Sequence, residues 1–279
     1  MIEKIQNDLM ENGYAKVNNV ISPVILSKVK KLMNENLISF LKKKNKKPKS
    51  KLNDNFYECK KIVSQHEIQV FLAKHLIEEG VYTEILNQKK IKEILINLLG
   101  PDLEYVTNSE LAINSKAETD EYYVKKYHQE FWSGSGIASL LFWVPFYLKP
   151  GMGTIEVIKK SHTWGHIPHS NREPIELPEN YLSEKINLKE GSLVFFTPLT
   201  LHRTVANKNK EIRVAAPITV RNFYYPKIGN EDLWEFKKLN LSFFSQFRKI
   251  LGNPQFSAYR TLNQKRKSIF SKEKLKKKY

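Results

Sequence analysis

The stretch EGSLVFFTPLTLHRTVANKNKEIRVAAPITVRNFYY, residues 190–225, decides the fold class of this chain. Short runs of apolar and aromatic residues alternate here with a turn at Thr197–Pro198 and a polar turn at residues 207–210. Such runs, bounded by turn residues, are typical of strands in an antiparallel sheet. We therefore expect three consecutive strands, and an antiparallel hairpin that places His202 across from Arg213.

The same pattern begins upstream, at about Leu103. Runs rich in Val, Ile, Phe, Tyr and Trp predict strands over residues 103–114, 123–131, 137–148, 153–158, 192–197, 200–206 and 211–224. Many short strands separated by turn residues indicate an all-β sandwich or barrel.

Helical periodicity dominates the chain before residue 103. Ser22 can cap a helix and Pro23 suits its first turn, and apolar residues then recur at helical spacing. Residues 66–99 are predicted to be helical in two pieces. We expect a single domain over residues 1–231, with a helical part at 1–102 and a β core at 103–225, and then a C-terminal extension over 232–279.

Composition excludes several classes of protein. The chain has 279 residues, of which 41% are hydrophobic, so it can bury a core. Cys59 is the one cysteine, which excludes an intramolecular disulfide and fits the cytoplasm. Residues 1–14 show no apolar signal segment, and the longest apolar run, residues 137–148, is too short to span a membrane.

The net charge of +17 is concentrated in two short runs. Residues 41–51 hold seven Lys and no acid, and residues 264–279 hold eight Lys or Arg and one Glu. Such runs are usually solvated faces, and the alternative is contact with an anionic surface or polyanion. A nucleic-acid-binding module would rest on these runs alone, and neither interleaves aromatic residues as single-strand binders do.

The motif YHQEFW, residues 127–132, contains two candidate metal ligands. If it lies on a strand, His128 and Glu130 project from the same face. A buried imidazole and carboxylate need a partner, and a divalent metal supplies one. With His202 they form the two-His, one-carboxylate set of non-haem Fe(II) oxygenases, which leaves positions for a 2-oxo acid and dioxygen. Arg213 offers a fork suited to the distal carboxylate of such an acid.

Other interpretations of these residues compete with the metal site. His128 could be a satisfied core histidine, and Glu130 could pair with Lys125 or Lys126. The nearby SHTWGHIPH, residues 161–169, could be a zinc cluster, but no fourth ligand is evident. Trp132, just after the motif, is either a substrate wall or ordinary barrel packing.

Four segments resemble the phytanoyl-CoA dioxygenase (PhyH) family of Fe(II)/2-oxoglutarate-dependent oxygenases. They are MENGYAKVNNVISPVILSKVKKLM (10–33), YHQEFW (127–132), GMGTIEVIKKSHTWGH (151–166) and GSLVFFTPLTLHRTVANKNKEIRVAAPITV (191–220). The resemblance covers roughly residues 5–225. It implies a double-stranded β-helix core, also called a jelly roll or cupin-like fold, and hydroxylation of a C–H bond with Fe(II), 2-oxoglutarate and dioxygen.

The resemblance also assigns roles to residues. It implies that His128, Glu130 and His202 bind iron. The cosubstrate residues would be Arg213 at the distal carboxylate, Thr204 assisting it, and Asn114 and Trp143 as pocket walls. His162 would be a structural residue of a turn, whereas His166 and His169 could line the substrate entrance.

This chain departs from the family pattern at two places. Glu130 stands where the family usually has Asp, which keeps open a catalytically inactive jelly-roll binding protein. Lys159–Lys160 replaces the family's Pro-Gly, and makes Lys160, with Trp132 and His166, a candidate substrate residue. The two lysines favour a small anionic or sugar-type substrate.

Overall fold

The computed structural model describes residues 1–116, 120–227, 231 and 233–251. The chain divides into two compact units, Met1–Leu239 and Asn240–Tyr279. Among the described residues, none of the helices is both long and apolar enough for a membrane crossing. The predicted domain boundary at residue 231 stays a prediction, and the basic tail over 264–279 lies outside the described residues.

Helices form most of the chain before residue 100. They are α1 (Ile2–Asn12), α2 (Pro23–Lys43), α3 (Leu52–Lys60), α4 (Gln65–Glu78), α5 (Val81–Leu86) and α6 (Lys89–Leu99). The Ser22 hydroxyl accepts a hydrogen bond from the Ile25 N–H at 3.3 Å, and Pro23 opens the helix, as predicted. The segment predicted as two helical pieces forms three, because Gly80 adopts a left-handed φ of 71° that ends α4 before α5 begins.

Two antiparallel sheets form the β core. The larger sheet has seven strands: β1 (Tyr14–Val17), β2 (Leu103–Val106), β3 (Ala112–Asn114), β4 (Ser139–Tyr147), β9 (Leu193–Phe196), β11 (Arg213–Asn222) and β12 (Phe236–Asn240). Its order is β1-β9-β4-β11-β2-β12, and β3 also pairs with β11. The smaller sheet has the order β10-β5-β8, with β10 (His202–Thr204), β5 (Ile155–Ile158) and β8 (Ser183–Lys185). A two-stranded hairpin joins β6 (His169–Ser170) to β7 (Glu173–Pro174).

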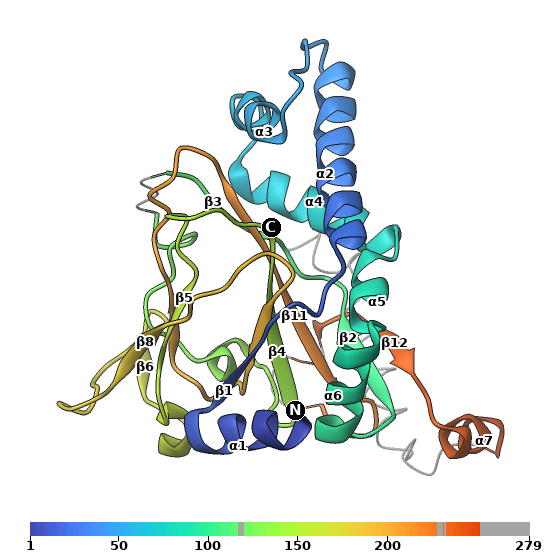
Figure 1. The fold of residues 1–279 in the computed structure, drawn as a ribbon, viewed down its shortest axis with the longest axis vertical. Coiled ribbons are helices and arrows are strands. Elements are labelled where there is room, and N and C mark those ends of the chain that lie inside the picture. Colours follow the sequence, from blue (N-terminus) through green and yellow to red (C-terminus); the bar gives the residue numbers. More distant parts are fainter. Residues whose placement is uncertain (117–119, 228–230, 232, 252–279) are drawn as a thin grey trace, which may run out of the picture. The chain divides into compact units, whose positions relative to one another are not determined.

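The large sheet is buried on both faces. Along β4, Leu140, Phe142 and Val144 belong to the core cluster that includes the helices. Leu141 and Trp143 alternate with them and pack in the cluster that contains β5. Figure 1 shows α2, α4, α5 and α6 along one side of the large sheet, and β5 and β8 on the other. The prediction of a mainly β fold with flanking helices is confirmed.

The segment 123–131 is not a strand, contrary to the sequence-based prediction. It contains turns, a single β-bridge at His128, and the start of a 3-10 helix, η1 (Glu130–Ser133). The strand cannot extend because its neighbour β10 is only three residues long and is preceded by the turn at Pro198. The Phe131 N–H donates to the Pro198 carbonyl at 3.1 Å and so turns the chain out of the sheet.

The predicted hairpin between His202 and Arg213 is also wrong. β10 pairs with β5 in the small sheet, whereas β11 pairs with β2, β3 and β4 in the large sheet. The connecting loop does not make a tight turn, because the Asn207 amide donates to the carbonyls of Asn114 and Glu211 instead. His202 and Arg213 therefore reach the site from different sheets.

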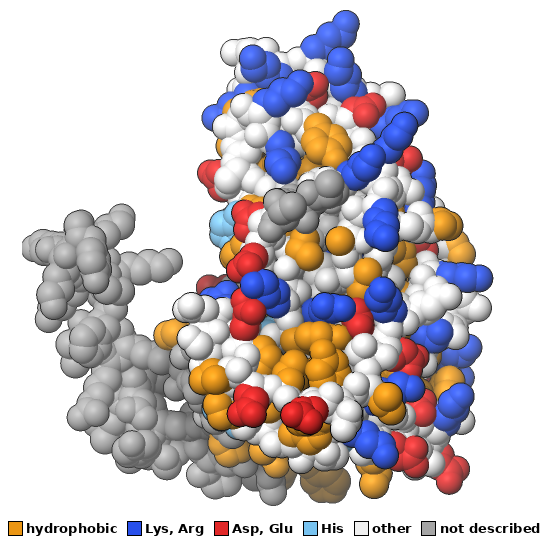
Figure 2. Space-filling model, turned by 90° about the vertical axis from the view of Figure 1, so that its left-hand side faces the viewer, with side chains coloured by type: hydrophobic (Ala, Val, Ile, Leu, Met, Phe, Trp, Pro, Cys, Tyr) orange, Lys and Arg blue, Asp and Glu red, His pale blue; other side chains and the backbone are white. Residues whose placement is uncertain are grey.

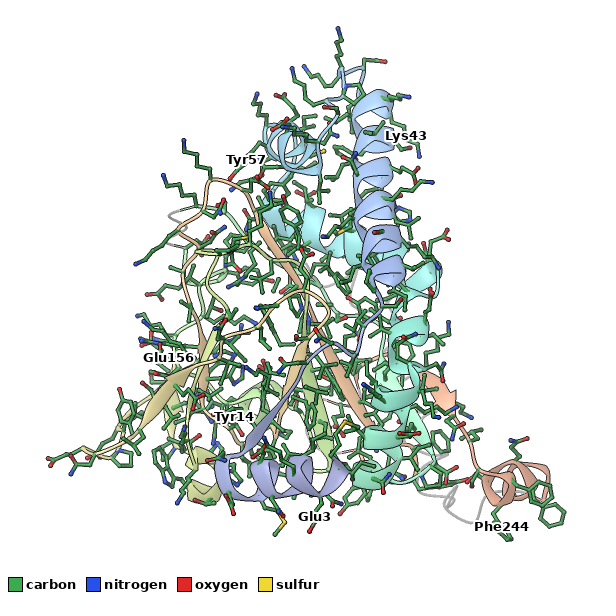
Figure 3. All side chains as sticks on the ribbon, in the orientation of Figure 1. Glu3, Tyr14, Lys43, Tyr57, Glu156 and Phe244 are labelled. Atoms are coloured by element: carbon green, nitrogen blue, oxygen red, sulfur yellow. The ribbon has the colours of Figure 1, made fainter. Side chains whose placement is uncertain are left out.

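The first basic run lies at the end of α2 and in the connection to α3. Figure 2 shows Lys and Arg side chains gathered at this upper end of the molecule, and Figure 3 places Lys43 there. The lysines of this run are exposed. In the second unit, α7 (Phe243–Leu251) follows Ser242, whose hydroxyl accepts from the Ser245 N–H at 3.3 Å.

Candidate metal centre

Three side chains converge at the interface between η1 and the small sheet. His128 and His202 pair directly through their backbones, with N–H···O distances of 3.0 and 3.1 Å. Glu130 Oε1 lies 3.4 Å from His128 Nε2 and 3.6 Å from His202 Nε2. The potential ligand atoms all lie within 4.8 Å of one another, and in the part of the chain that the structure describes this is the one such group of His, Cys, Asp or Glu.

The hydrogen bonds of the two imidazoles orient them for a metal. Nδ1 of His128 lies 2.8 Å from the Lys126 carbonyl, and Nδ1 of His202 lies 3.0 Å from the Thr200 carbonyl. Because a carbonyl only accepts, each Nδ1 carries the proton and each Nε2 presents a lone pair. His128 Nε2 is buried without a hydrogen-bond partner. This arrangement of neutral imidazoles held through Nδ1 is the usual one for metal-ligating histidines.

The geometry of the three residues fits a divalent ion. Two ligands about 2.1 Å from one ion at a right angle lie about 3.0 Å apart. The observed distances of 3.4 and 3.6 Å need to close by only a few tenths of an ångström. The donor set, two imidazole nitrogens and one carboxylate, is the one that suits non-haem iron.

The protonation states also fit a metal. Burial opposes ionisation of Glu130, but the neighbouring His128 and His202 outweigh it and hold the pKa of the carboxyl well below its usual range. Burial, and then the neighbouring His128, lower the pKa of His202. At neutral pH the site therefore offers a carboxylate and a neutral imidazole, which are the forms that bind metal.

Arg213 is a buried cation without an acidic partner among the described residues. Its side chain is about 1% exposed. Nη1 donates to the carbonyls of Thr154 and Val205, both at 3.1 Å, and Nη2 donates to Asn114 Oδ1. Nε is buried with no partner. Burial lowers the pKa of Arg213 to about 9, so the guanidinium is still charged at neutral pH and its free donors suit a carboxylate.

The predicted cosubstrate residues gather around this arginine. Trp143 and Thr204 line the same cavity as the three ligand residues. The Arg213 guanidinium lies 5.4 Å from the centre of the Trp143 ring, and Asn114 is its partner in the β3–β11 register. The structure thus brings together seven residues predicted from sequence: His128, Glu130, His202, Arg213, Thr204, Asn114 and Trp143.

The three predicted substrate residues have different surroundings. Trp132 stacks on His169, with ring centres 4.4 Å apart, and lines a second cavity that borders His128. His166 is exposed, and its ring centre lies 5.4 Å from that of Phe131. Lys160 is exposed and lines neither of these cavities. Its backbone N–H donates to the Asn12 carbonyl at the end of α1.

The histidines of SHTWGHIPH do not form a metal site among the described residues. His162 Nε2 bonds to the Met10 carbonyl at 3.0 Å, and the ring packs against Gly13, where an added Cβ would lie 2.5 Å from Nδ1. His162 therefore fixes α1 to the turn, which is the structural role expected of it.

Sequence reasoning missed one residue that positions the metal ligands. The Gln129 side chain points away from the metal site and is fully buried. Its amide donates to the carbonyls of Gly165 and Leu199 at 2.8 and 2.7 Å, and its oxygen accepts from the Ile167 N–H at 3.1 Å. These three bonds fix the backbone between His128 and Glu130, and the only sequence signal was a polar residue on the opposite face of the motif.

Comparison with known proteins agrees with this geometry. The family model described as phytanoyl-CoA dioxygenase (PhyH) matches residues 9–215. No curated protein sequence matches the chain.

Solved structures share the fold at low sequence identity. One is a non-heme monooxygenase, ThoJ, with 14% identity and a TM-score of 0.58 over 85% of this chain and 84% of that one. Another is the non-heme alpha ketoglutarate dependent carbocyclase SnoK of nogalamycin biosynthesis, with 16% identity and a TM-score of 0.53 over 83% and 89%. A third is AviO1 from Streptomyces viridochromogenes Tue57, with 12% identity and a TM-score of 0.52 over 82% and 98%. These similarities confirm the predicted jelly-roll fold.

Proposed function

The chain belongs to the phytanoyl-CoA dioxygenase (PhyH) family, and from this premise we propose that it is an Fe(II)- and 2-oxoglutarate-dependent dioxygenase that hydroxylates a C–H bond of a small molecule. One observation carries the proposal. One cavity is lined both by the His-Glu-His group and by Trp143. One imidazole nitrogen of this group has no hydrogen-bond partner. The guanidinium of Arg213, which has no acidic partner among the described residues, lies over the Trp143 ring. A metal and a carboxylate are the two groups that these residues lack.

Three residues of the site would bind iron, and two backbone carbonyls orient the imidazoles among them. His128, Glu130 and His202 would hold iron, which when bound supplies the activation of dioxygen that is coupled to decarboxylation of 2-oxoglutarate. The Lys126 and Thr200 carbonyls keep each Nε2 directed at the centre by accepting the Nδ1 protons. No side chain needs to act as a general base.

The arginine that lies over Trp143 would orient 2-oxoglutarate. Arg213 donates to the distal carboxylate, and Asn114 together with the Thr154 and Val205 carbonyls holds the guanidinium in place. Trp143 and Ile155 exclude water from this contact, which strengthens the ion pair. Thr204 lines the same cavity and would offer its hydroxyl to that carboxylate.

The experiment measures both products of the proposed reaction. We expect succinate to form only with Fe(II) and 2-oxoglutarate present, and the true substrate, sought in a metabolite library, to gain one oxygen atom per succinate. A product without the added oxygen would contradict hydroxylation but not dependence on iron and 2-oxoglutarate. Solved structures with a similar fold include an epimerase and a carbocyclase. An iron-loaded protein that never forms succinate would instead support the alternative, an inactive jelly-roll binding protein.

Two further expectations stay predictions. Residues 41–51 would contact an anionic surface or polyanion through the exposed lysines at the end of α2, together with residues 264–279. The expected location in the cytoplasm rests on the sequence alone.

A further inference from the structure

A second cavity borders the metal centre on the side of His128. It lies between the segment 121–133 and the turn of the β6–β7 hairpin. We propose that this cavity binds an anionic group of the substrate, a carboxylate or a phosphate, between Lys125 and Arg172. The inference rests on the proposed function and deepens it, since it names the chemical class of the substrate.

The charges that line this cavity do not cancel. Lys126 forms ion pairs with both acids of the lining, at 2.7 Å to Glu121 and 2.8 Å to Glu173. Lys125 and Arg172 also line the cavity, and their side chains make no ion pair or hydrogen bond with another described residue. The charged residues of the lining therefore sum to +1, and neither Lys125 nor Arg172 is engaged by its acids.

The hairpin turn holds Arg172 in an unusual backbone conformation. Asn171 and Arg172 have φ values of 51° and 63°, in the left-handed region. Asn tolerates this region, but a long side chain such as Arg is rarely found there. The ion pair between Lys126 and Glu173 ties the hairpin to the metal-binding segment, so the turn keeps Arg172 at the edge of the cavity.

Lys125 connects this cavity to the metal centre. It also lines the interior cavity, together with all three ligand residues, and it precedes His128 by three positions. An anion bound to Lys125 would therefore lie beside the metal rather than on a remote surface. Tyr122 and Trp132 line the same cavity and offer flat apolar walls for the body of the substrate.

Direct titration of two small anions tests the inference. The full chain, loaded with Mn(II) and 2-oxoglutarate so that the cosubstrate position is filled, is titrated calorimetrically with inorganic phosphate and, separately, with benzoate. The buffer contains about 0.15 M salt, which screens isolated surface lysines. We expect saturable binding of at least one anion, and a fall in its affinity of about tenfold in Lys125→Ala and in Arg172→Ala.

Lys160→Ala is the matched control. It removes one positive charge from an exposed lysine that does not line the cavity, and it should leave both titrations unchanged. Binding of phosphate alone would indicate a phosphate ester as substrate, and binding of benzoate alone a carboxylic acid. Binding of both would support the anion site for either class.

Three outcomes would overturn the inference. They are the absence of saturable binding of either anion to the unmodified chain, an unchanged affinity in both Lys125→Ala and Arg172→Ala, and an equal loss in Lys160→Ala. None of these measurements requires turnover. Failure of the succinate assay with intact anion binding would contradict the proposed function alone, and the reverse result would contradict only the anion site.

Discussion

Two groups at the interior cavity, the metal ligands and the arginine that lies over Trp143, have opposite hydrogen-bonding character. His128, Glu130 and His202 present lone pairs, and one buried nitrogen has no partner. Next to Trp143, which lines the same cavity, Arg213 presents N–H donors, and its buried Nε has no acceptor. Buried polar groups in folded proteins are nearly always satisfied, so each unsatisfied atom needs an explanation. A cation at the ligands and an anion at the arginine satisfy both.

The two groups also differ in how the chain builds them. Arg213 starts β11, which pairs with three strands of the large sheet. Glu130 lies in a short 3-10 helix, and His128 is fixed by a single β-bridge and by the bonds of Gln129. A rigid sheet thus positions the arginine, whereas side-chain hydrogen bonds position the metal ligands. Substitutions in the two groups should therefore separate metal binding from cosubstrate binding.

Removal of a histidine ligand should have the largest effect. In His128→Ala or His202→Ala, two remaining ligands cannot hold the ion, so we expect Fe(II) affinity to fall by more than about a hundredfold, beyond the range for outer-shell changes. Metal content after gel filtration and a direct metal titration measure this loss. His162→Ala is the control, since that ring bonds to the Met10 carbonyl and should leave metal binding intact. A full complement of iron in either ligand variant would refute the assignment.

Glu130 tests whether the longer carboxylate works as a ligand. Both Asp and Glu can bind a metal through one oxygen, so Glu130→Asp should keep iron and part of the turnover. Glu130→Ala leaves two histidines without the carboxylate that lies 3.4 and 3.6 Å from them, and coupled turnover should fall to background. Succinate formation per iron is the measurement. Equal rates in the unmodified chain and Glu130→Ala would show that this carboxylate is not a ligand.

The ligand residues could be predicted because their signal is local. His128 and Glu130 are two positions apart, so they face one way in an extended segment even though that segment pairs at a single residue. The runs of apolar and aromatic residues after residue 103 likewise predict which segments are extended. Six observed strands fall within these runs: β2, β4, β5, β9, β10 and β11. Alternation of apolar residues is a property of each segment and needs no knowledge of its partner.

Pairing partners and surface juxtapositions could not be predicted in the same way. The polar segment between His202 and Arg213 looks like a hairpin turn, but Asn207 bonds to the Asn114 carbonyl, a contact 93 residues away. Lys125 and Arg172 meet at one cavity from distant parts of the sequence, and no periodicity connects them. The helix α3 follows a lysine-rich run and was not predicted, although Leu52, Phe56 and Cys59 recur at helical spacing.

Arg213→Ala should weaken the binding of 2-oxoglutarate and leave iron binding intact. A charge-assisted contact to a buried carboxylate is worth on the order of 2–4 kcal/mol, so 2-oxoglutarate affinity should fall by roughly 30- to 1000-fold. Iron binding should survive because Arg213 is not a ligand. Arg213→Lys should recover only part of the loss, since one ammonium cannot reproduce the fork. A 2-oxoglutarate titration of Arg213→Ala that overlays that of the unmodified chain would refute the role.

Substitutions of Asn114 should have the smallest effects, and they test whether the uncompensated charge of Arg213 attracts 2-oxoglutarate. The Asn114 oxygen accepts from Arg213, and its amide donates to the Tyr123 carbonyl at 2.6 Å. An aspartate would give Arg213 an internal counter-charge, so 2-oxoglutarate would compete with it and bind about tenfold more weakly, a difference of about 1.4 kcal/mol.

Asn114→Ala separates charge from hydrogen bonding in this comparison. It loses the same bond to Tyr123 as the aspartate does, but it leaves the Arg213 charge uncompensated. We therefore expect 2-oxoglutarate affinity to decrease from the unmodified chain to Asn114→Ala to Asn114→Asp, as measured by calorimetry on the metal-loaded protein. If Asn114→Asp bound 2-oxoglutarate more tightly than Asn114→Ala, the uncompensated charge of Arg213 would not be what attracts the cosubstrate. In that case the cavity would have to hold its anion by contacts other than this arginine.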